Sequence, residues 1–468
     1  MTRPPRAAAL AGVLAFAAAG GCEGCRHRTR FASRGDAAAV VVVPQKAGDD
    51  LGTPLGDEGE PNNTVAAAHL LPFGGDPLRA GVAGTLPGAG KGADVDVFKI
   101  VIPGLGLDAG AEASAPADAL AARRLIVDLR PDEGLAPVLQ LLDAAARPVV
   151  TTSAGAGERD GLPNVAVAPG GTYFLRLRAE RPAKAAADAG AGGSGYRLAV
   201  RVVDFEVGDE REPNDRAAQA TELGGAHTNP EVAGFFGWRR DEDWYRLPVE
   251  GLPAGTVLDL ELDGVEGVSA SLALHDAGGT RMAGAHGRRG ERVVLRNVGL
   301  GAAPAAPVAG RDASAGGRAV YAVVKTEGGR NLDARYTLHV RAELAKEGSE
   351  TEPNDDPAHA SPLPDGLTTG FLPPGDTDVF RYTPQAPGLL DLEVTPPDRV
   401  NVKVEVLSAA GQLLAGADEA GRRAPERLLN VVVAEPVLVR LTQRKGDGNA
   451  DEPYQLRVTS HPPGGAPQ

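Results

Sequence analysis

A four-residue signature occurs three times in this chain and constrains its fold more than any other feature. Each copy is followed by a glycine and then by an Asp-x-Asp-x-aromatic element. The signatures are Glu60-Pro61-Asn62-Asn63, Glu212-Pro213-Asn214-Asp215 and Glu352-Pro353-Asn354-Asp355. The glycines are Gly84, Gly234 and Gly370, and the aspartate pairs are Asp94 and Asp96, Asp241 and Asp243, Asp376 and Asp378. Recurrence in one order predicts three copies of one domain, each with its own core.

Within each copy the sequence favours short strands. Leu258, Leu260 and Leu262 alternate with polar residues, and the same period of two recurs at 125–129 and 390–394. Paired runs later in each copy, at 173–177 and 196–200, 321–324 and 336–340, and 437–441 and 454–458, favour further strands. The 62 glycines and 38 prolines interrupt helices and favour turns. The chain is therefore predicted to be all-β, with three tandem antiparallel β-sandwich domains that are jelly-roll-like.

The beginning of the sequence has the features of an export signal. Arg3 and Arg6 precede a short apolar stretch, and small residues lead to Cys22. Residues 19–22, Ala-Gly-Gly-Cys, resemble a bacterial lipoprotein processing site, which implies that Cys22 is lipidated. Two alternatives are conventional secretory cleavage after an alanine and a disulfide or metal site formed by Cys22 and Cys25.

These features divide the chain into six parts. Residues 1–22 are the predicted signal peptide, 23–56 a flexible tether rich in Ala, Arg and Gly, and 462–468 a tail. Between them lie three predicted β-sandwiches, which we call repeat 1 (57–205), repeat 2 (206–346) and repeat 3 (347–461).

The repeated motifs resemble those of the bacterial pre-peptidase C-terminal domain, which is related to the collagen-binding modules of clostridial collagenases. The resemblance rests on the Glu-Pro-Asn signature, the Asp-x-Asp-x-aromatic element, an Asp-x-x-Gly turn and a late Tyr-x-Leu strand, and it covers nearly all of 57–460. It implies non-catalytic β-sandwich modules of exported proteins. In the collagen-binding relatives the matching Glu-x-Glu-Pro-Asn segment and the downstream aspartates bind calcium.

Each repeat carries the side chains from which a calcium site can be built. Calcium prefers carboxylate and amide oxygens, and alternation places both aspartates of Asp-x-Asp on one side of an extended segment. The candidate ligands are Glu58, Glu60, Asn62, Asn63, Asp94 and Asp96; Glu210, Glu212, Asn214, Asp215, Asp241 and Asp243; and Glu350, Glu352, Asn354, Asp355, Asp376 and Asp378. The same residue types also form turns and caps without a metal. We expect the strongest binding in repeats 2 and 3, because Asn63 replaces an aspartate in repeat 1.

Repeat 2 contains both tryptophans of the chain. Phe236 and Tyr245 occupy positions that are apolar or aromatic in the other repeats, so we expect them in the core. Trp238 and Trp244 are the candidates for exposed ligand contacts, since exposed aromatic side chains stack on sugars and anchor peptides.

The sequence favours a binding role over a catalytic one. The eight histidines are scattered, no usual nucleophile motif is present, and the net charge of −14 argues against a nucleic-acid partner. We expect a non-catalytic, lipid-anchored protein of the bacterial cell envelope, most simply at the outer membrane. Its calcium-stiffened rod of modules would bind an envelope or extracellular protein or polysaccharide. The alternatives are a structural spacer or assembly factor with a protein partner and, ranked lowest, a hydrolase with an unrecognised active site.

Overall fold

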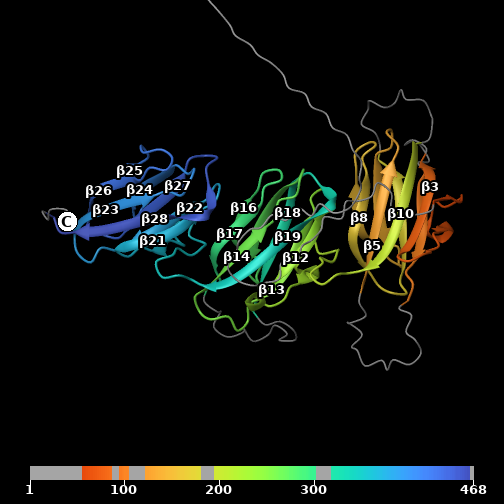
Figure 1. Cartoon of the computed structure of the whole chain (residues 1–468), viewed down its shortest axis with the longest axis horizontal. Helices are drawn as coiled ribbons and strands as arrows, with labels where there is room; N and C mark the ends of the chain where they lie inside the picture. The colour runs from red at the N-terminus through yellow and green to blue at the C-terminus, as the bar shows by residue number, and fades with distance from the viewer. Residues whose placement is uncertain (1–54, 87–93, 105–121, 181–193, 302–317, 464–468) are drawn as a thin grey trace, which may run out of the picture. The chain divides into compact units, whose positions relative to one another are not determined.

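Strands make up nearly all the regular structure of the residues that the computed structural model describes, which are 55–86, 94–104, 122–180, 194–301 and 318–463 (Figure 1). The chain divides into two units, Met1–Gln45 and Lys46–Gln468, and the first lies outside the described residues. The strands of the second unit form six sheets, two in each repeat. The predicted all-β fold class is confirmed.

In all three repeats the strands follow one topology. The first sheet of repeat 1 has the order β1 (Gly56–Asp57), β3 (Leu78–Leu86), β10 (Ser194–Asp204), β5 (Arg123–Pro131) and β8 (Asp160–Val167). Its second sheet has the order β2 (His69–Leu70), β4 (Val95–Val101), β9 (Thr172–Ala179), β6 (Pro137–Leu142) and β7 (Pro148–Ser153). The two-residue strands β1 and β2 pair in parallel, and every other pairing in these two sheets is antiparallel.

Repeats 2 and 3 copy this order, except that their first sheets have four strands and no counterpart of β1 among the described strands. The sheets of repeat 2 are β12 (Glu231–Phe236), β19 (Asn331–Leu344), β14 (Thr256–Leu262) and β17 (Val293–Gly299), and β11 (Thr221–Glu222), β13 (Glu242–Pro248), β18 (Ala319–Gly328), β15 (Ser269–His275) and β16 (Arg281–His286). Those of repeat 3 are β21 (Gly366–Leu372), β28 (Asn449–His461), β23 (Gly388–Thr395) and β26 (Glu426–Val433), and β20 (Ser361–Pro362), β22 (Thr377–Tyr382), β27 (Val437–Gln443), β24 (Val402–Ser408) and β25 (Leu413–Ala417).

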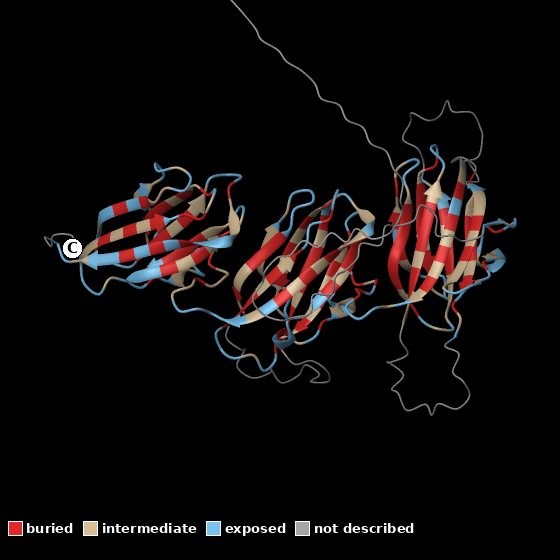
Figure 2. Ribbon diagram, viewed as in Figure 1, coloured by how far each residue is buried: buried red, intermediate tan, exposed pale blue. Residues whose placement is uncertain are grey.

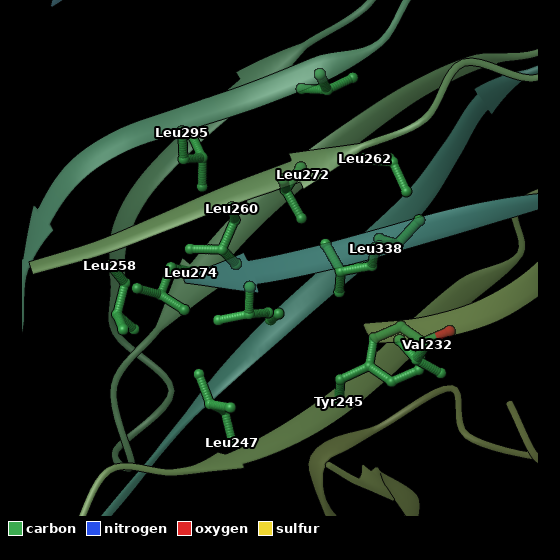
Figure 3. Close-up of a cluster of buried hydrophobic side chains, with 14 of the residues drawn as sticks. Val232, Tyr245, Leu247, Leu258, Leu260, Leu262, Leu272, Leu274, Leu295 and Leu338 are labelled. Carbon is green, nitrogen blue, oxygen red and sulfur yellow. The ribbon is translucent and has the colours of Figure 1, made fainter. Parts of the chain in front are cut away.

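Alternation along the strands fills the space between the two sheets of each repeat. In β14 the side chains of Leu258, Leu260 and Leu262 are fully buried, whereas Asp259 and Glu261 lie on the other face. Figure 3 shows these leucines meeting side chains of β13 and β15, which belong to the opposite sheet. Each repeat has such a buried apolar cluster, seen as the red bands of the strands in Figure 2.

Among the described residues, helical structure is confined to single turns. Short 3₁₀ helices at Val65–Ala67 and Ala217–Gln219 follow the Glu-Pro-Asn signatures of repeats 1 and 2, and a third lies at Ala226–Thr228. No helix among the described residues has the length and apolar character needed to cross a membrane.

Candidate cation site in each repeat

The signature of each repeat brings three carboxylates together. In repeat 2 the backbone amide of Trp244 in β13 donates to the carbonyl of Asn214, and that of Glu210 donates to Ala233 in β12, so the signature is held by both sheets. One carboxylate oxygen each from Glu210, Glu212 and Asp243 then lies within 4.8 Å of the others. The corresponding groups are Glu58, Glu60 and Asp96 in repeat 1 and Glu350, Glu352 and Asp378 in repeat 3. The Glu-Pro bond of every signature is cis.

Each three-carboxylate group is contacted by a tyrosine from the strand that pairs with the glycine-containing strand of its repeat. The Tyr336 hydroxyl of β19 donates to Asp243 Oδ2 at 2.6 Å, and the Tyr454 hydroxyl of β28 donates to Glu350 Oε2 at 2.7 Å. In repeat 1 the Tyr196 hydroxyl lies 2.5 Å from Asp96 Oδ2. The candidate ligand set did not include these tyrosines, although the recurring Tyr-x-Leu pattern contains all three.

The glycine shared by the repeats makes room for this contact. A Cβ atom on Gly234 would lie 2.3 Å from Glu210 Oε2 and 2.4 Å from the Tyr336 hydroxyl, closer than real Cβ contacts come. Gly84 and Gly370 have the same close neighbours in their own repeats. The recurrence of glycine here therefore follows from the space that the glutamate and tyrosine side chains require.

Backbone amides hold one oxygen of each glutamate and leave others without a partner. In repeat 2, Phe235 N–H donates to Glu210 Oε2 at 2.9 Å and Asn214 N–H donates to Glu212 Oε2 at 2.8 Å. Four buried oxygens in or beside the three-carboxylate group accept no hydrogen bond: Glu212 Oε1, Asn214 Oδ1, Asp241 Oδ1 and Asp243 Oδ1. In repeat 3 the same is true of Asn354 Oδ1 and both carboxylate oxygens of Asp378. Buried polar atoms without partners are costly, so each of these oxygens is available to a proton or a cation.

The electrostatics of the clusters point the same way. Burial raises the pKa of Glu212 and of Asp243 well above the usual range, and the nearby Glu210 carboxylate raises both further. Burial and the Glu350 carboxylate raise the pKa of Glu352 to about 8. No arginine or lysine in the described part of the chain forms an ion pair with these carboxylates. A buried group of like charges needs either protons or a cation.

The first aspartate of each Asp-x-Asp element lies next to the cluster. Asp241 is fully buried and accepts a hydrogen bond from Gly237 N–H at 2.7 Å, while the Glu210 carboxylate adds to the rise that burial causes in its pKa. The Asp376 carboxylate accepts from Thr377 N–H, and its pKa is raised well above the usual range by burial and by Glu352. Asp94 accepts from Val95 N–H. These aspartates are not members of the three-carboxylate groups.

The last residue of each signature is exposed and lies outside the three-carboxylate groups. These residues are Asn63, Asp215 and Asp355. The ranking of the three sites by the asparagine at position 63 stays a prediction. Repeat 1 still differs, because Glu60 is exposed and Glu58 only half-buried, whereas Glu210 and Glu212 are both buried. Asn62, the signature amide of repeat 1, is buried like Asn214 and Asn354.

The two tryptophans do not form one exposed patch. Trp238 is only 7% exposed and belongs to the buried apolar cluster of repeat 1, so the expectation of a surface contact is wrong for this residue. Burial of this large apolar ring against repeat 1 is more favourable than its exposure to solvent. Trp244 is half-buried on the outer face of β13, where its indole N–H donates to Glu242 and its ring meets Tyr321 edge-on. Phe236 and Tyr245 are fully buried, as expected.

Cys22, the candidate lipidation residue, lies outside the described residues.

Comparisons with known proteins leave the family open. No family model and no curated protein matches the chain. Similar solved structures include the CUB1-EGF-CUB2 region of human MASP-1/3, at 8% identity and a TM-score of 0.16 over 56% of this chain and 99% of that one. Another is the BSP domain of a biofilm associated protein, at 9% identity and a TM-score of 0.15 over 83% of this chain and 67% of that one. A third is a triple jelly-roll protein of an archaeal virus, at 10% identity and a TM-score of 0.17 over 80% of this chain and 88% of that one. At these TM-scores the likenesses carry no argument about function.

Proposed function

We propose that this protein is a non-catalytic array of calcium-stabilised β-sandwich modules of the pre-peptidase C-terminal type. The observation that carries the proposal is the set of buried carboxylate and amide oxygens without partners in repeats 2 and 3. All these donors are oxygens, without a cysteine or histidine among them, and such a set suits a hard cation. Calcium accepts irregular geometries with six to eight oxygen ligands, whereas magnesium demands an octahedron and keeps its waters.

The sequence supports an exported location for this array. The export signal and the small residues before Cys22 favour a lipid anchor in the bacterial cell envelope. We infer that the modules, held at the membrane by this anchor, bind an envelope or extracellular protein or polysaccharide. Trp244 is the remaining aromatic candidate for contact with such a ligand.

A second candidate function is a structural spacer or assembly factor. The burial of Trp238 in the cluster of repeat 1 favours it, because this aromatic side chain joins repeats and is not displayed to a ligand. Arrays of glycans and of matrix and envelope proteins distinguish the two functions. Binding to one class that weakens in Trp244→Ala would support the first, and binding to none would support the spacer.

Calcium binding is tested by melting the full chain in millimolar calcium, in magnesium and in chelator. We expect calcium to raise the melting temperature, and we expect Asp243→Asn to reduce the rise and to weaken calcium binding about tenfold or more, because one ligand loses its charge. The matched control is Glu242→Gln, whose side chain lies on the other face of the same strand and bonds Trp244. Equal melting temperatures in calcium and chelator would exclude a calcium site.

A further inference from the structure

Successive repeats are joined by the same pair of backbone hydrogen bonds. At the first junction Ala166 N–H in β8 donates to Glu212 O at 2.7 Å, and Glu212 N–H donates to Asn164 O at 3.3 Å. At the second junction Gly299 N–H in β17 donates to Glu352 O at 2.7 Å, and Glu352 N–H donates to Asn297 O at 3.0 Å. The edge strand of one repeat thus pairs in parallel with the signature glutamate of the next, Glu212 or Glu352.

β26 of repeat 3 has the same construction as β17. In both strands the register shifts across two residues, Arg296-Asn297 and Leu429-Asn430, and the asparagine adopts a left-handed conformation with φ of 51° or 58°. The N–H of each asparagine donates to an aspartate of the neighbouring strand, Asp259 at 2.8 Å and Asp391 at 2.6 Å. In repeat 2 the edge strand β17 pairs with the following repeat. Repeat 3 has an edge strand of the same conformation, β26.

Among the described residues nothing pairs with this edge of β26. Leu429 and Val432 are 62% and 75% exposed, and Leu413 and Leu414 of β25 are also exposed. Leu429 stands where β17 has Arg296, which bonds the carbonyl of Ala450 in repeat 3. An exposed apolar edge strand with free backbone groups is a site for pairing with another chain.

The complementary segment is also present in this chain. Glu58-Gly59-Glu60-Pro61 of repeat 1 matches the segments that dock onto β8 and β17, and Gly59 and Glu60 are exposed. Among the described residues none hydrogen-bonds the backbone of Glu60.

Side-chain size at the second junction also fits this segment. A Cβ on Gly299 would lie 2.6 Å from Thr351 Cγ2, so a residue without a side chain faces threonine there. At the candidate contact the larger residue is on the edge strand instead, because Val432 would face Gly59. The His69 ring, whose Nδ1 accepts from Gly59 N–H, lies beside that glycine.

We propose that the β25–β26 edge of repeat 3 binds the Glu58–Pro61 segment of a second copy of this chain. Val432 N–H would donate to Glu60 O of the second copy, and Glu60 N–H would donate to Asn430 O. The two surfaces differ, so the contact is heterologous and each added copy leaves one free surface of each kind. Copies would therefore associate head to tail in an open series. The contact uses backbone groups of the Glu58–Pro61 segment and apolar side chains, while the Glu58 and Glu60 carboxylates of the same segment belong to the candidate cation site of repeat 1.

Sedimentation velocity of the full chain tests the proposal. We expect the mean mass to rise at least twofold between about 1 and about 100 µM without a plateau at the dimer, as for a small transient interface. Val432→Asp should abolish the rise, because it places a charge in the contact. The matched control, Leu367→Asp on the opposite edge strand of the same sheet, should associate like the wild type. Unchanged melting temperatures would show that both variants fold.

A mixing experiment separates the open series from other assemblies. A Val432→Asp chain keeps its own Glu58 segment, so it should add to the wild type, end the series and lower the mean mass in proportion to its share. A monomer at every concentration would overturn the proposal. A closed dimer, or association that Val432→Asp leaves intact, would overturn it too, and binding of β26 only to a different protein would assign the edge to that partner.

Discussion

At the scale of single residues, steric crowding explains why each repeat has a glycine at the same position. Gly234 lies where any Cβ would collide with the Glu210 carboxylate and the Tyr336 hydroxyl. We expect Gly234→Ala to destabilise repeat 2 by about 1–3 kcal/mol, because the methyl overpacks a closed site, and to reduce the calcium-dependent rise in melting temperature. Gly328→Ala in the same repeat is the control, since nothing lies within 4 Å of its added Cβ. Equal calcium responses in the two variants would contradict this account of the site.

The carboxylates give the protein a pH dependence that calcium should reverse. Burial and Glu350 raise the folded-state pKa of Glu352 from 4.5 to about 8, so in chelator its contribution to stability is present below the unfolded pKa and is lost as pH rises through about 8. The melting temperature of metal-free protein should therefore fall between about pH 5 and about pH 8. If calcium binds as proposed, it replaces protons at the ionised site, so its stabilising effect should grow over the same interval.

Differential scanning fluorimetry of three chains checks this pH dependence. Glu352→Gln removes one titrating group and should flatten the fall in chelator, while Glu419→Gln, at an exposed position, should melt like the wild type. A melting temperature in chelator that rises from pH 5 to pH 8 would refute the assigned direction.

At the scale of elements, alternation predicted the central strands and the site segments. Leu258, Leu260 and Leu262 alternate without a break, and β14 follows them. The edge strands β8, β17 and β26 were missed, because a register shift at Asn164, Asn297 or Asn430 breaks the period of two. The tyrosine of each site was also missed as a site residue, since its aromatic ring fits a core strand and only the fold brings its hydroxyl to the carboxylates.

The sequence also did not predict the contact between β8 and the signature of repeat 2. Asn164 Nδ2 donates to Glu210 Oε2 at 2.9 Å in a buried position, whereas Asn297 makes no such bond to Glu350. The amide favours the charged form of Glu210, so Asn164→Ala should weaken calcium binding in repeat 2 by about 1.5 kcal/mol, roughly tenfold. Calorimetric titration measures this, with Asn297→Gly as the control because glycine keeps the left-handed conformation. An equal loss in both variants would argue against a specific role of the Asn164 amide.

At the scale of the whole molecule, repeats 1 and 2 share contacts that repeats with separate cores would lack. Trp238 comes from repeat 2 but is buried in the apolar cluster of repeat 1, and Gly237 beside it lies against Pro163. Arg330 and Asp160 form an ion pair across the same junction at 2.6 Å, with Asp160 fully buried. Contacts of this kind couple the unfolding of two modules, because opening one exposes apolar surface of the other.

Trp238→Ala should break this coupling. Loss of a buried tryptophan costs about 3–5 kcal/mol, and here the cost falls on repeat 1 and on the junction, although the residue belongs to repeat 2. Scanning calorimetry should therefore show repeat 1 melting as a separate, earlier transition, while Trp244→Ala, which removes a half-buried ring from an outer sheet face, should leave the coupling intact. If Trp238→Ala lowered only the stability of repeat 2, the ring would be stabilising its own repeat alone.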